Sequence, residues 1–106
     1  MQPTYIRGSK IRFELQFFDI NKNLIVPAAP VIHINYVITK YTRSTVNIAL
    51  TLSNNFYVTD WDSGVSYPGE IYWSAESGST DINKISYDGI FSLSANPANP
   101  VPVVVP

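Results

Sequence analysis

The sequence contains no cysteine, one histidine and few charged residues, and these shortages exclude several classes of protein. Without cysteine the chain can form neither a disulfide framework nor a thiol site. Charged residues are 14% of the 106 residues, the formal net charge is −1, and the seven basic residues are scattered. Because nucleic-acid binding requires a basic stripe or patch, we predict no nucleic-acid partner.

Long apolar runs are also missing from the sequence. A membrane-spanning helix needs about 20 consecutive apolar residues, and no run approaches that length, so we predict no membrane association. The first ten residues, MQPTYIRGSK, lack the apolar core of a signal peptide. We therefore expect synthesis in the cytoplasm without a secretion signal.

Alternation of apolar and polar residues is the dominant pattern in the chain. It is clearest in residues 11–17, 32–38, 46–52 and 71–75, and a period of two is typical of strands with one buried face. No segment has helical periodicity, and turn residues recur about every ten positions. The sequence therefore predicts an all-β fold, an antiparallel β-sandwich of about seven strands.

The same alternation predicts which aromatic residues form the core. Trp73 and Phe91 fall at inward positions, and an outward Asp60 turns Trp61 inward. Asp88-Gly89 is a favoured dipeptide of two-residue hairpins, so it predicts a turn between two strands.

Few residues are candidates for chemistry. His33 lies on the polar face of a predicted strand, the sequence contains no nucleophile elbow, and we interpret this histidine as a surface or cross-strand residue. Residues 60–64, DWDSG, begin like a calcium-binding loop. Gly64 nevertheless takes the third ligand position and Ile71 the position of the bidentate glutamate, which favours a strand-ending turn whose aspartate bonds its own backbone.

Paired carboxylates are the remaining catalytic possibility. Asp60, Asp62, Glu70 and Glu76 could approach one another in a hairpin, as glycoside hydrolysis requires, but all four have the setting of solvated turn or strand residues. We predict that the protein is not an enzyme and has no cofactor or metal.

Three segments taken in order carry a family resemblance. They are RGSKIRFELQFFDINKNL, FYVTDWDSGVSYPGEIYWSAES and YDGIFSLSANPANP, spanning Arg7 to Pro100. Together they resemble small proteins encoded among the structural genes of tailed bacteriophages and prophages. The resemblance implies an immunoglobulin-like sandwich that is a structural component of the virion, with no catalytic residues to transfer. Asn21-Lys22-Asn23 replaces the more usual Asp-Gly turn, and VPVVVP at 101–106 has no counterpart.

We divide the chain into an N-terminal arm (1–9), a β-sandwich domain (10–95) and an extended Pro/Val-rich C-terminal arm (96–106). The expected function is that of a capsid decoration or auxiliary protein, or another virion assembly component, located in the virion. It would bind neighbouring capsid or tail subunits, or further copies of itself, through its termini. The expected contact residues are Tyr5, Ile6, Val101, Val103, Val104 and Val105.

An alternative function rests on the abundance of tyrosine and tryptophan at low charge. An aromatic ring gives a large contact area at small entropic cost, which suits stacking on a sugar. In this alternative the chain is a carbohydrate-binding or receptor-binding accessory module, with Trp61, Tyr67 and Tyr72 as the stacking platform.

Overall fold

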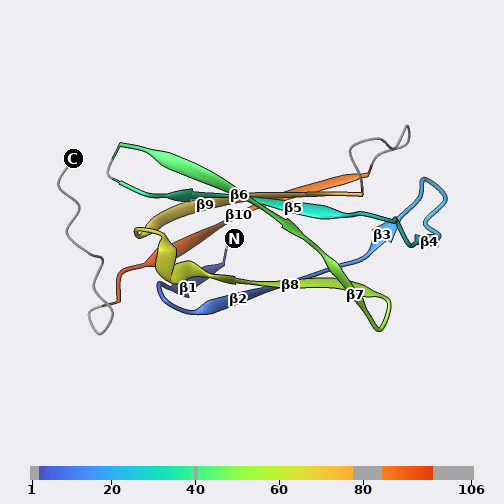
Figure 1. The fold of residues 1–106 in the computed structure, drawn as a ribbon, viewed down its shortest axis with the longest axis horizontal. Coiled ribbons are helices and arrows are strands. Elements are labelled where there is room, and N and C mark those ends of the chain that lie inside the picture. The colour runs from blue at the N-terminus through green and yellow to red at the C-terminus, as the bar shows by residue number, and fades with distance from the viewer. Residues whose placement is uncertain (1–2, 40, 78–84, 97–106) are drawn as a thin grey trace.

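The computed structural model describes residues 3–39, 41–77 and 85–96, which form ten strands and one short 3₁₀ helix (Figure 1). The strands are β1 (Thr4–Ile6), β2 (Lys10–Leu15), β3 (Phe17–Phe18), β4 (Leu24–Ile25), β5 (Val31–Val37), β6 (Arg43–Ala49), β7 (Thr51–Ser53), β8 (Phe56–Asp62), β9 (Gly69–Glu76) and β10 (Ser86–Ser94), with the helix η1 at Ser63–Val65. The prediction of an all-β fold is confirmed.

The strands form two main sheets and one small one. The five-stranded sheet has the order β1-β10-β9-β5-β6, the three-stranded sheet has the order β2-β8-β7, and β3 pairs with β4. All pairings are antiparallel except that of β1 with β10, which is parallel. The predicted count of about seven strands and the purely antiparallel arrangement are therefore wrong.

The predicted hairpin at Asp88-Gly89 is also wrong, because both residues lie within the continuous strand β10. Asp88 pairs with Ser74 and Gly89 pairs with Trp73. A Cβ atom on Gly89 would lie 2.6 Å from Nε1 of Trp73. The glycine is needed here for the close approach of an indole ring, and not for a turn.

Two predicted strands are each divided where the chain leaves a sheet. The run 46–52 is split at Leu50 between β6 in the five-stranded sheet and β7 in the three-stranded sheet. The amide of Leu50 donates to the carbonyl of Pro30 at 3.1 Å, which satisfies the backbone at the crossing. The run 11–17 is divided in the same way at Gln16.

The turns follow from asparagine and aspartate. Asn54 and Asn55 have φ angles of 51° and 69° and connect β7 to β8 in a two-residue hairpin, as type I′ turns require. In the turn between β3 and β4, the Asp19 carboxylate accepts the amides of Asn21 and Asn23 at 2.8 and 2.9 Å. The predicted turn at residues 19–23 is confirmed.

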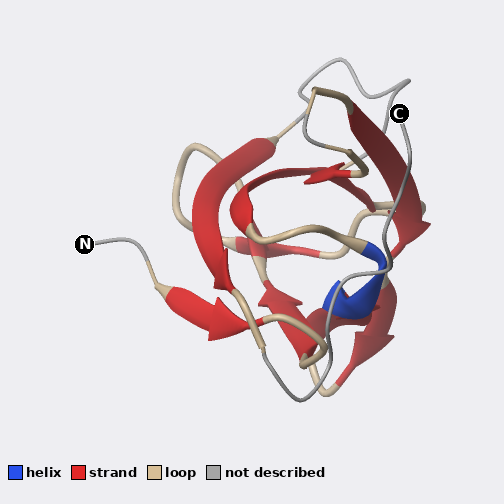
Figure 2. Ribbon diagram, turned by 90° about the vertical axis from the view of Figure 1, so that its left-hand side faces the viewer, coloured by secondary structure: helices blue, strands red, loops and turns tan. Residues whose placement is uncertain are grey.

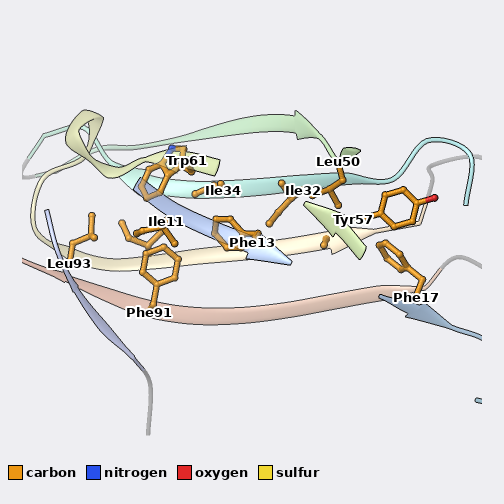
Figure 3. Packing of buried hydrophobic residues seen from close by; sticks show 12 residues of the cluster. Ile11, Phe13, Phe17, Ile32, Ile34, Leu50, Tyr57, Trp61, Phe91 and Leu93 are labelled. Atoms are coloured by element: carbon orange, nitrogen blue, oxygen red, sulfur yellow. The ribbon is translucent and has the colours of Figure 1, made fainter. Parts of the chain in front are cut away.

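The hydrophobic core lies between the two main sheets (Figure 3). Seen along the longest axis, the strands enclose this common interior (Figure 2). Phe91 of the five-stranded sheet contacts Phe13 and Trp61 of the three-stranded sheet, with ring centroids 6.1 and 6.3 Å apart. The inward placement of Trp61 and Phe91 is confirmed, and Trp73 is partly buried against the same cluster. Among the described residues, the core consists of Ile11, Phe13, Phe17, Ile32, Ile34, Leu50, Tyr57, Trp61, Ile71, Ala75, Phe91 and Leu93.

A buried arginine fixes one end of the molecule. Arg7 is 3% exposed, and it donates from Nε to the carbonyl of Ser66 at 2.6 Å and from Nη2 to that of Gly64 at 2.5 Å. The Ser63 hydroxyl donates to the carbonyl of Ser9 at 2.6 Å, which ties η1 to the β1–β2 connection. We call this group of residues (Arg7, Ser9, Ser63, Gly64 and Ser66) the Arg7 latch. Part of the predicted N-terminal arm thus belongs to a hydrogen-bonded network with η1.

Candidate functional site

An open hollow of about 730 Å³ lies on the outer face of the five-stranded sheet. Two adjacent cross-strand rows of outward-facing side chains line it. The first row is Thr45, Asn35, Tyr72 and Ile90, from β6, β5, β9 and β10. The second row is His33, Ser74 and Asp88, and it continues to Asn47 on β6. We call this site the outer-face hollow.

Tyr72 is the aromatic residue of the first row, and its ring is held in place from one side. The guanidinium carbon of Arg43 lies 4.8 Å from the centroid of the Tyr72 ring. Arg43 also donates to the Asn35 side chain and to the carbonyl of Glu70, the latter at 2.5 Å. Tyr72 nevertheless remains 42% exposed, so a large part of it faces solvent.

His33 occupies the centre of the second row and is held by its neighbours. Its Nδ1 lies 2.5 Å from Oδ1 of Asn47, an acceptor, so Nδ1 carries the hydrogen of this bond. Its Nε2 lies 3.7 Å from Oε1 of Glu76. The interpretation of His33 as a surface or cross-strand residue is confirmed, because its side chain contacts that of its cross-strand partner Asn47.

Ser74 and Asp88 provide the uncommitted polar groups of the hollow. Within the described ranges, neither side chain forms a hydrogen bond or an ion pair. They face each other in register on β9 and β10. A hydroxyl and a carboxylate are thus available to a ligand beside the exposed part of Tyr72.

The three aromatic residues of the predicted stacking platform do not come together. Trp61 is 5% exposed, and its ring packs 5.8 Å from that of Tyr36 in the core. Tyr72 lies on the other side of the five-stranded sheet, and Tyr67 is half-buried after η1. A platform containing Trp61 is therefore wrong, because this ring is covered by the core. Of these three predicted residues, only Tyr72 lines the hollow.

Of the predicted contact residues at the termini, two are described. Tyr5 is 40% exposed and packs edge-on against Phe91 with 5.4 Å between ring centroids, and Ile6 is 56% exposed. Within the predicted C-terminal arm only Asn96 is described, and its side-chain Nδ2 donates to the carbonyl of Arg7 at 3.2 Å. Val101, Val103, Val104 and Val105 lie outside the described residues.

A second surface, which sequence analysis missed, consists of exposed apolar side chains on two hairpins. Figure 1 places β3 and β4 at the end of the molecule opposite η1. The β7–β8 hairpin lies at the same end, because Tyr57 donates to the carbonyl of Pro27 at 2.5 Å and Gln16 donates to that of Asn55 at 3.4 Å. We call this surface the hairpin end. Its exposed apolar residues are Phe18, Ile20, Leu24, Val26, Leu52 and Phe56.

The four carboxylates considered for catalysis are exposed or partly exposed residues on β8 and β9, where Asp60 and Asp62 lie two residues apart. Asp60 is 3.7 Å from Arg12, and Asp62 accepts the amide of Gly64 at 2.9 Å at the start of η1, as a strand-ending turn predicts. Glu70 and Glu76 lie near opposite ends of β9, about 20 Å apart along an extended strand. Within residues 3–39, 41–77 and 85–96, no three acidic or histidine side chains are grouped to hold a metal ion.

Burial perturbs one titratable group near the hairpin end. Tyr57 is 4% exposed, and burial raises the pKa of its hydroxyl because the phenolate is poorly solvated there. The hydroxyl donates to Pro27, so its neutral form completes the core at this end.

The outer-face hollow could not be located from the sequence. Alternation predicts that Tyr72, Ser74 and His33 face outward, but the order and register of β6, β5, β9 and β10 decide which of them are neighbours. The hairpin end did have a sequence signal. The turn residues at 19–23 include Ile20 and are flanked by Phe18 and Leu24, whereas an ordinary surface turn is polar.

Neither a membrane-spanning helix in the described part of the chain nor a known relative adds to the description of these sites. Among the described residues, no helix is long and apolar enough to cross a membrane. A scan against protein-family models and searches of curated proteins and solved structures found no match to this chain.

Proposed function

We propose that the chain is a non-enzymatic structural protein of a tailed-phage particle, a capsid decoration or auxiliary protein or a related assembly component. In this proposal its two packed sheets are an immunoglobulin-like sandwich, and the protein is made in the host cytoplasm and becomes part of the virion. The resemblance of three sequence segments, taken in order from Arg7 to Pro100, supports the assignment to this group of phage proteins. The roles of Asp60 beside Arg12 and of Asp62 as acceptor of the Gly64 amide support structural rather than catalytic use of these two carboxylates.

The hairpin end is the observation that carries the proposal. Six apolar side chains are between 40% and 96% exposed on two linked hairpins at one end of the molecule. Grouped apolar side chains on a surface mark sites of contact with other proteins. We therefore assign the principal contact with a neighbouring virion subunit to the hairpin end, with Tyr5 and Ile6 on β1 as a second contact.

Assembly in a particle explains why a modest apolar surface is sufficient. Burial of apolar surface contributes about 25 cal/mol per Å², so each contact of this size is weak. Repetition of the contact around a symmetric lattice raises the effective affinity through multivalency. Low charge also fits this function, since adhesion to a fixed lattice needs no long-range electrostatic steering.

The test is the incorporation of variants into particles of the phage or prophage that encodes the chain. Purified particles are analysed by quantitative mass spectrometry, with copy number expressed relative to the major capsid protein. We expect the wild-type chain in stoichiometric or fixed substoichiometric amounts. Ile20→Ser combined with Val26→Ser should lower incorporation strongly, while the thermal stability of the isolated protein is unchanged.

The matched control is Val65→Ser, which removes a 57% exposed valine from η1 at the opposite end. This control should incorporate normally. Absence of the wild-type chain from particles would refute the proposed function. Normal incorporation of the Ile20→Ser/Val26→Ser variant would refute the assigned contact and direct attention to β1.

The predicted terminal arms are tested in the same assay. Deletion of residues 101–106 removes Val101, Val103, Val104 and Val105. Reduced incorporation with an unchanged unfolding midpoint supports an arm that contacts a neighbour. A lower unfolding midpoint with normal incorporation shows instead that this segment belongs to the folded domain.

A further inference from the structure

We propose that the outer-face hollow is a binding site for a neutral sugar unit of a glycan, with Tyr72 as the stacking residue and Ser74, Asp88 and His33 as the polar contacts. This inference is independent of assembly through the hairpin end, because the hollow lies on the outer face of the five-stranded sheet. It differs from the predicted aromatic platform in that Trp61 and Tyr67 have no part in it.

The first argument is the combination of an open aromatic side chain with an apolar neighbour. Tyr72 is 42% exposed and Ile90, beside it on β10, is 40% exposed. The C–H face of a pyranose packs on such a surface, since a tyrosine offers apolar area together with a polar tip. Arg43, stacked on Tyr72 and bonded to Asn35, holds the ring before a ligand arrives. A prearranged ring loses little freedom on binding.

The second argument is the position of the polar groups relative to that ring. Ser74 is two residues along β9 from Tyr72, and Asp88 faces Ser74 across one strand spacing. These steps correspond to about 7 Å along a strand and about 5 Å between strands. A sugar ring beside Tyr72 therefore places its hydroxyl groups over Ser74 and Asp88.

The uncommitted state of those groups is the third argument. Asp88 and Ser74 have no side-chain partner within the part of the chain that the structure describes. A carboxylate is an acceptor with two oxygens, so it can take hydrogen bonds from two adjacent sugar hydroxyls. Ser74 can donate or accept. His33 lies beside Ser74 in the same row, with its Nε2 3.7 Å from Oε1 of Glu76.

Charge and size favour a neutral sugar over other ligands. The Asp88 carboxylate, and Glu76 beyond His33, disfavour phosphate, sulfate and uronic acid groups. The positive charge of Arg43 is directed to Asn35 and to the carbonyl of Glu70. The volume of about 730 Å³ is in the range of about 300–1,000 Å³ that is usual for sites of small ligands.

The experiment measures binding of the full chain to immobilised polysaccharides. The neutral probes are dextran, laminarin, galactomannan and starch, and the anionic probes are alginate and hyaluronan. Trp73 also lines the hollow, so tryptophan fluorescence during titration with soluble oligosaccharides from the best polysaccharide gives a second readout. We expect saturable binding to at least one neutral polysaccharide and none to the anionic ones.

Four variants locate the site. Tyr72→Ala should weaken binding by about tenfold or more, equivalent to about 1.4 kcal/mol, while Tyr72→Phe keeps the ring and should retain affinity within about threefold. Asp88→Ala should weaken binding by about fivefold, through the loss of its hydrogen bonds. Tyr41→Ala is the matched control, because Tyr41 is 77% exposed and does not line the hollow. Equal unfolding midpoints for the four variants exclude a general effect on the fold.

Three outcomes would overturn the proposal. They are no binding of the wild-type chain to any neutral polysaccharide, binding only to the anionic polysaccharides, and equal affinity of wild type and Tyr72→Ala. Concentration-dependent dimerisation that Tyr72→Ala abolishes, without glycan binding, would assign the hollow to a second copy of the chain instead.

Discussion

The two ends of the β2–β8 ladder use their residues in opposite ways. At one end, where Lys10 pairs with Asp62, the Arg7 latch buries polar groups and satisfies them within the protein. At the other end, where Leu15 pairs with Tyr57, the hairpin end leaves apolar side chains in solvent. The first arrangement serves the stability of the fold, whereas the second contributes little to it.

This contrast indicates where a partner would bind. A buried arginine that donates to two carbonyls fixes a loop in one conformation. These groups already have hydrogen-bond partners within the protein, so a binding partner would gain little from contacting them. Exposed apolar side chains lose contact with water only when another surface covers them. Substitutions at the two ends should therefore have different effects, with large losses of stability at the latch and small ones at the hairpins.

The largest effect is expected for Arg7→Met. This change removes the hydrogen bonds to Ser66 and Gly64 and leaves two carbonyls without their donor, in a site where Arg7 is 3% exposed. Loss of charge-assisted bonds in a buried site should lower the free energy of unfolding by about 3 kcal/mol or more. Chemical denaturation of wild type and variant measures this difference in the free energy of unfolding.

The control for Arg7 is Arg12→Met. Arg12 is exposed and pairs at the surface with Glu14 and Asp60, so its removal should change stability little. Equal losses in the two variants would show that the latch has no special role.

A smaller effect is expected at the turn of the β7–β8 hairpin. Asn55 has a φ of 69°, in the left-handed region that costs alanine more free energy than asparagine. Asn55→Ala should therefore lower the free energy of unfolding by about 1 kcal/mol, and Asn55→Gly should be neutral or slightly stabilising. A denaturation series of the two variants checks the prediction, and equal losses in both would show that the side chain matters more than the backbone.

Tyr57 should give a pH-dependent effect of similar or smaller size. Burial raises its pKa above the value of about 10 in the unfolded chain. The contribution of its neutral form is thus complete below pH 10 and is lost as the pH rises through the folded-state pKa. Tyr57→Phe should cost about 1 kcal/mol at pH 7, through the lost bond to Pro27, and should reduce the loss of stability above pH 10. Unfolding midpoints of wild type and Tyr57→Phe at pH 7 and pH 11 test this prediction. If the variant loses as much stability between these pH values as wild type does, the effect belongs to other tyrosines.

The smallest effect on stability is expected from Ile20→Ser and Val26→Ser, each made alone. These side chains are 96% and 61% exposed, so each change should alter the free energy of unfolding by less than about 0.5 kcal/mol. Binding of an apolar dye to the native protein should decrease in both. A loss above 1 kcal/mol in either variant would show that the side chain packs within the fold, and the contrast between the ends would then disappear.

The sequence predicted the class of fold because alternation with a period of two depends only on neighbouring residues. The inward positions of Trp61 and Phe91 followed from the same pattern. The pattern contains no information on which strand lies beside which. Gly89 illustrates this, since its dipeptide has the signature of a turn and only the neighbouring Trp73 explains why it is in a strand.

The candidate sites were less predictable for the same reason. Of the predicted platform only Tyr72 lies in the hollow, and its neighbours Ser74, Asp88 and His33 come from three strands that the register brings together. The hairpin end depends on the contact of Tyr57 with Pro27, thirty positions apart. The outer-face hollow does not follow from the spacing of residues along the chain. The apolar turn around Ile20 gives a signal for part of the hairpin end, but not for its contact with the β7–β8 hairpin.

The parallel pairing of β1 with β10 has a consequence for the order of folding. Thr4 pairs with Ser92, and the side chain of Asn96 donates to the carbonyl of Arg7, 89 positions away in the sequence. At about 5–20 residues per second, a ribosome needs about 4–18 s to add that length of chain. During this interval Tyr5 and Ile6 have no strand to join and are available to chaperones or to wrong partners. The pairing of β1 with β10, which completes this edge of the sheet, can therefore form only late in synthesis.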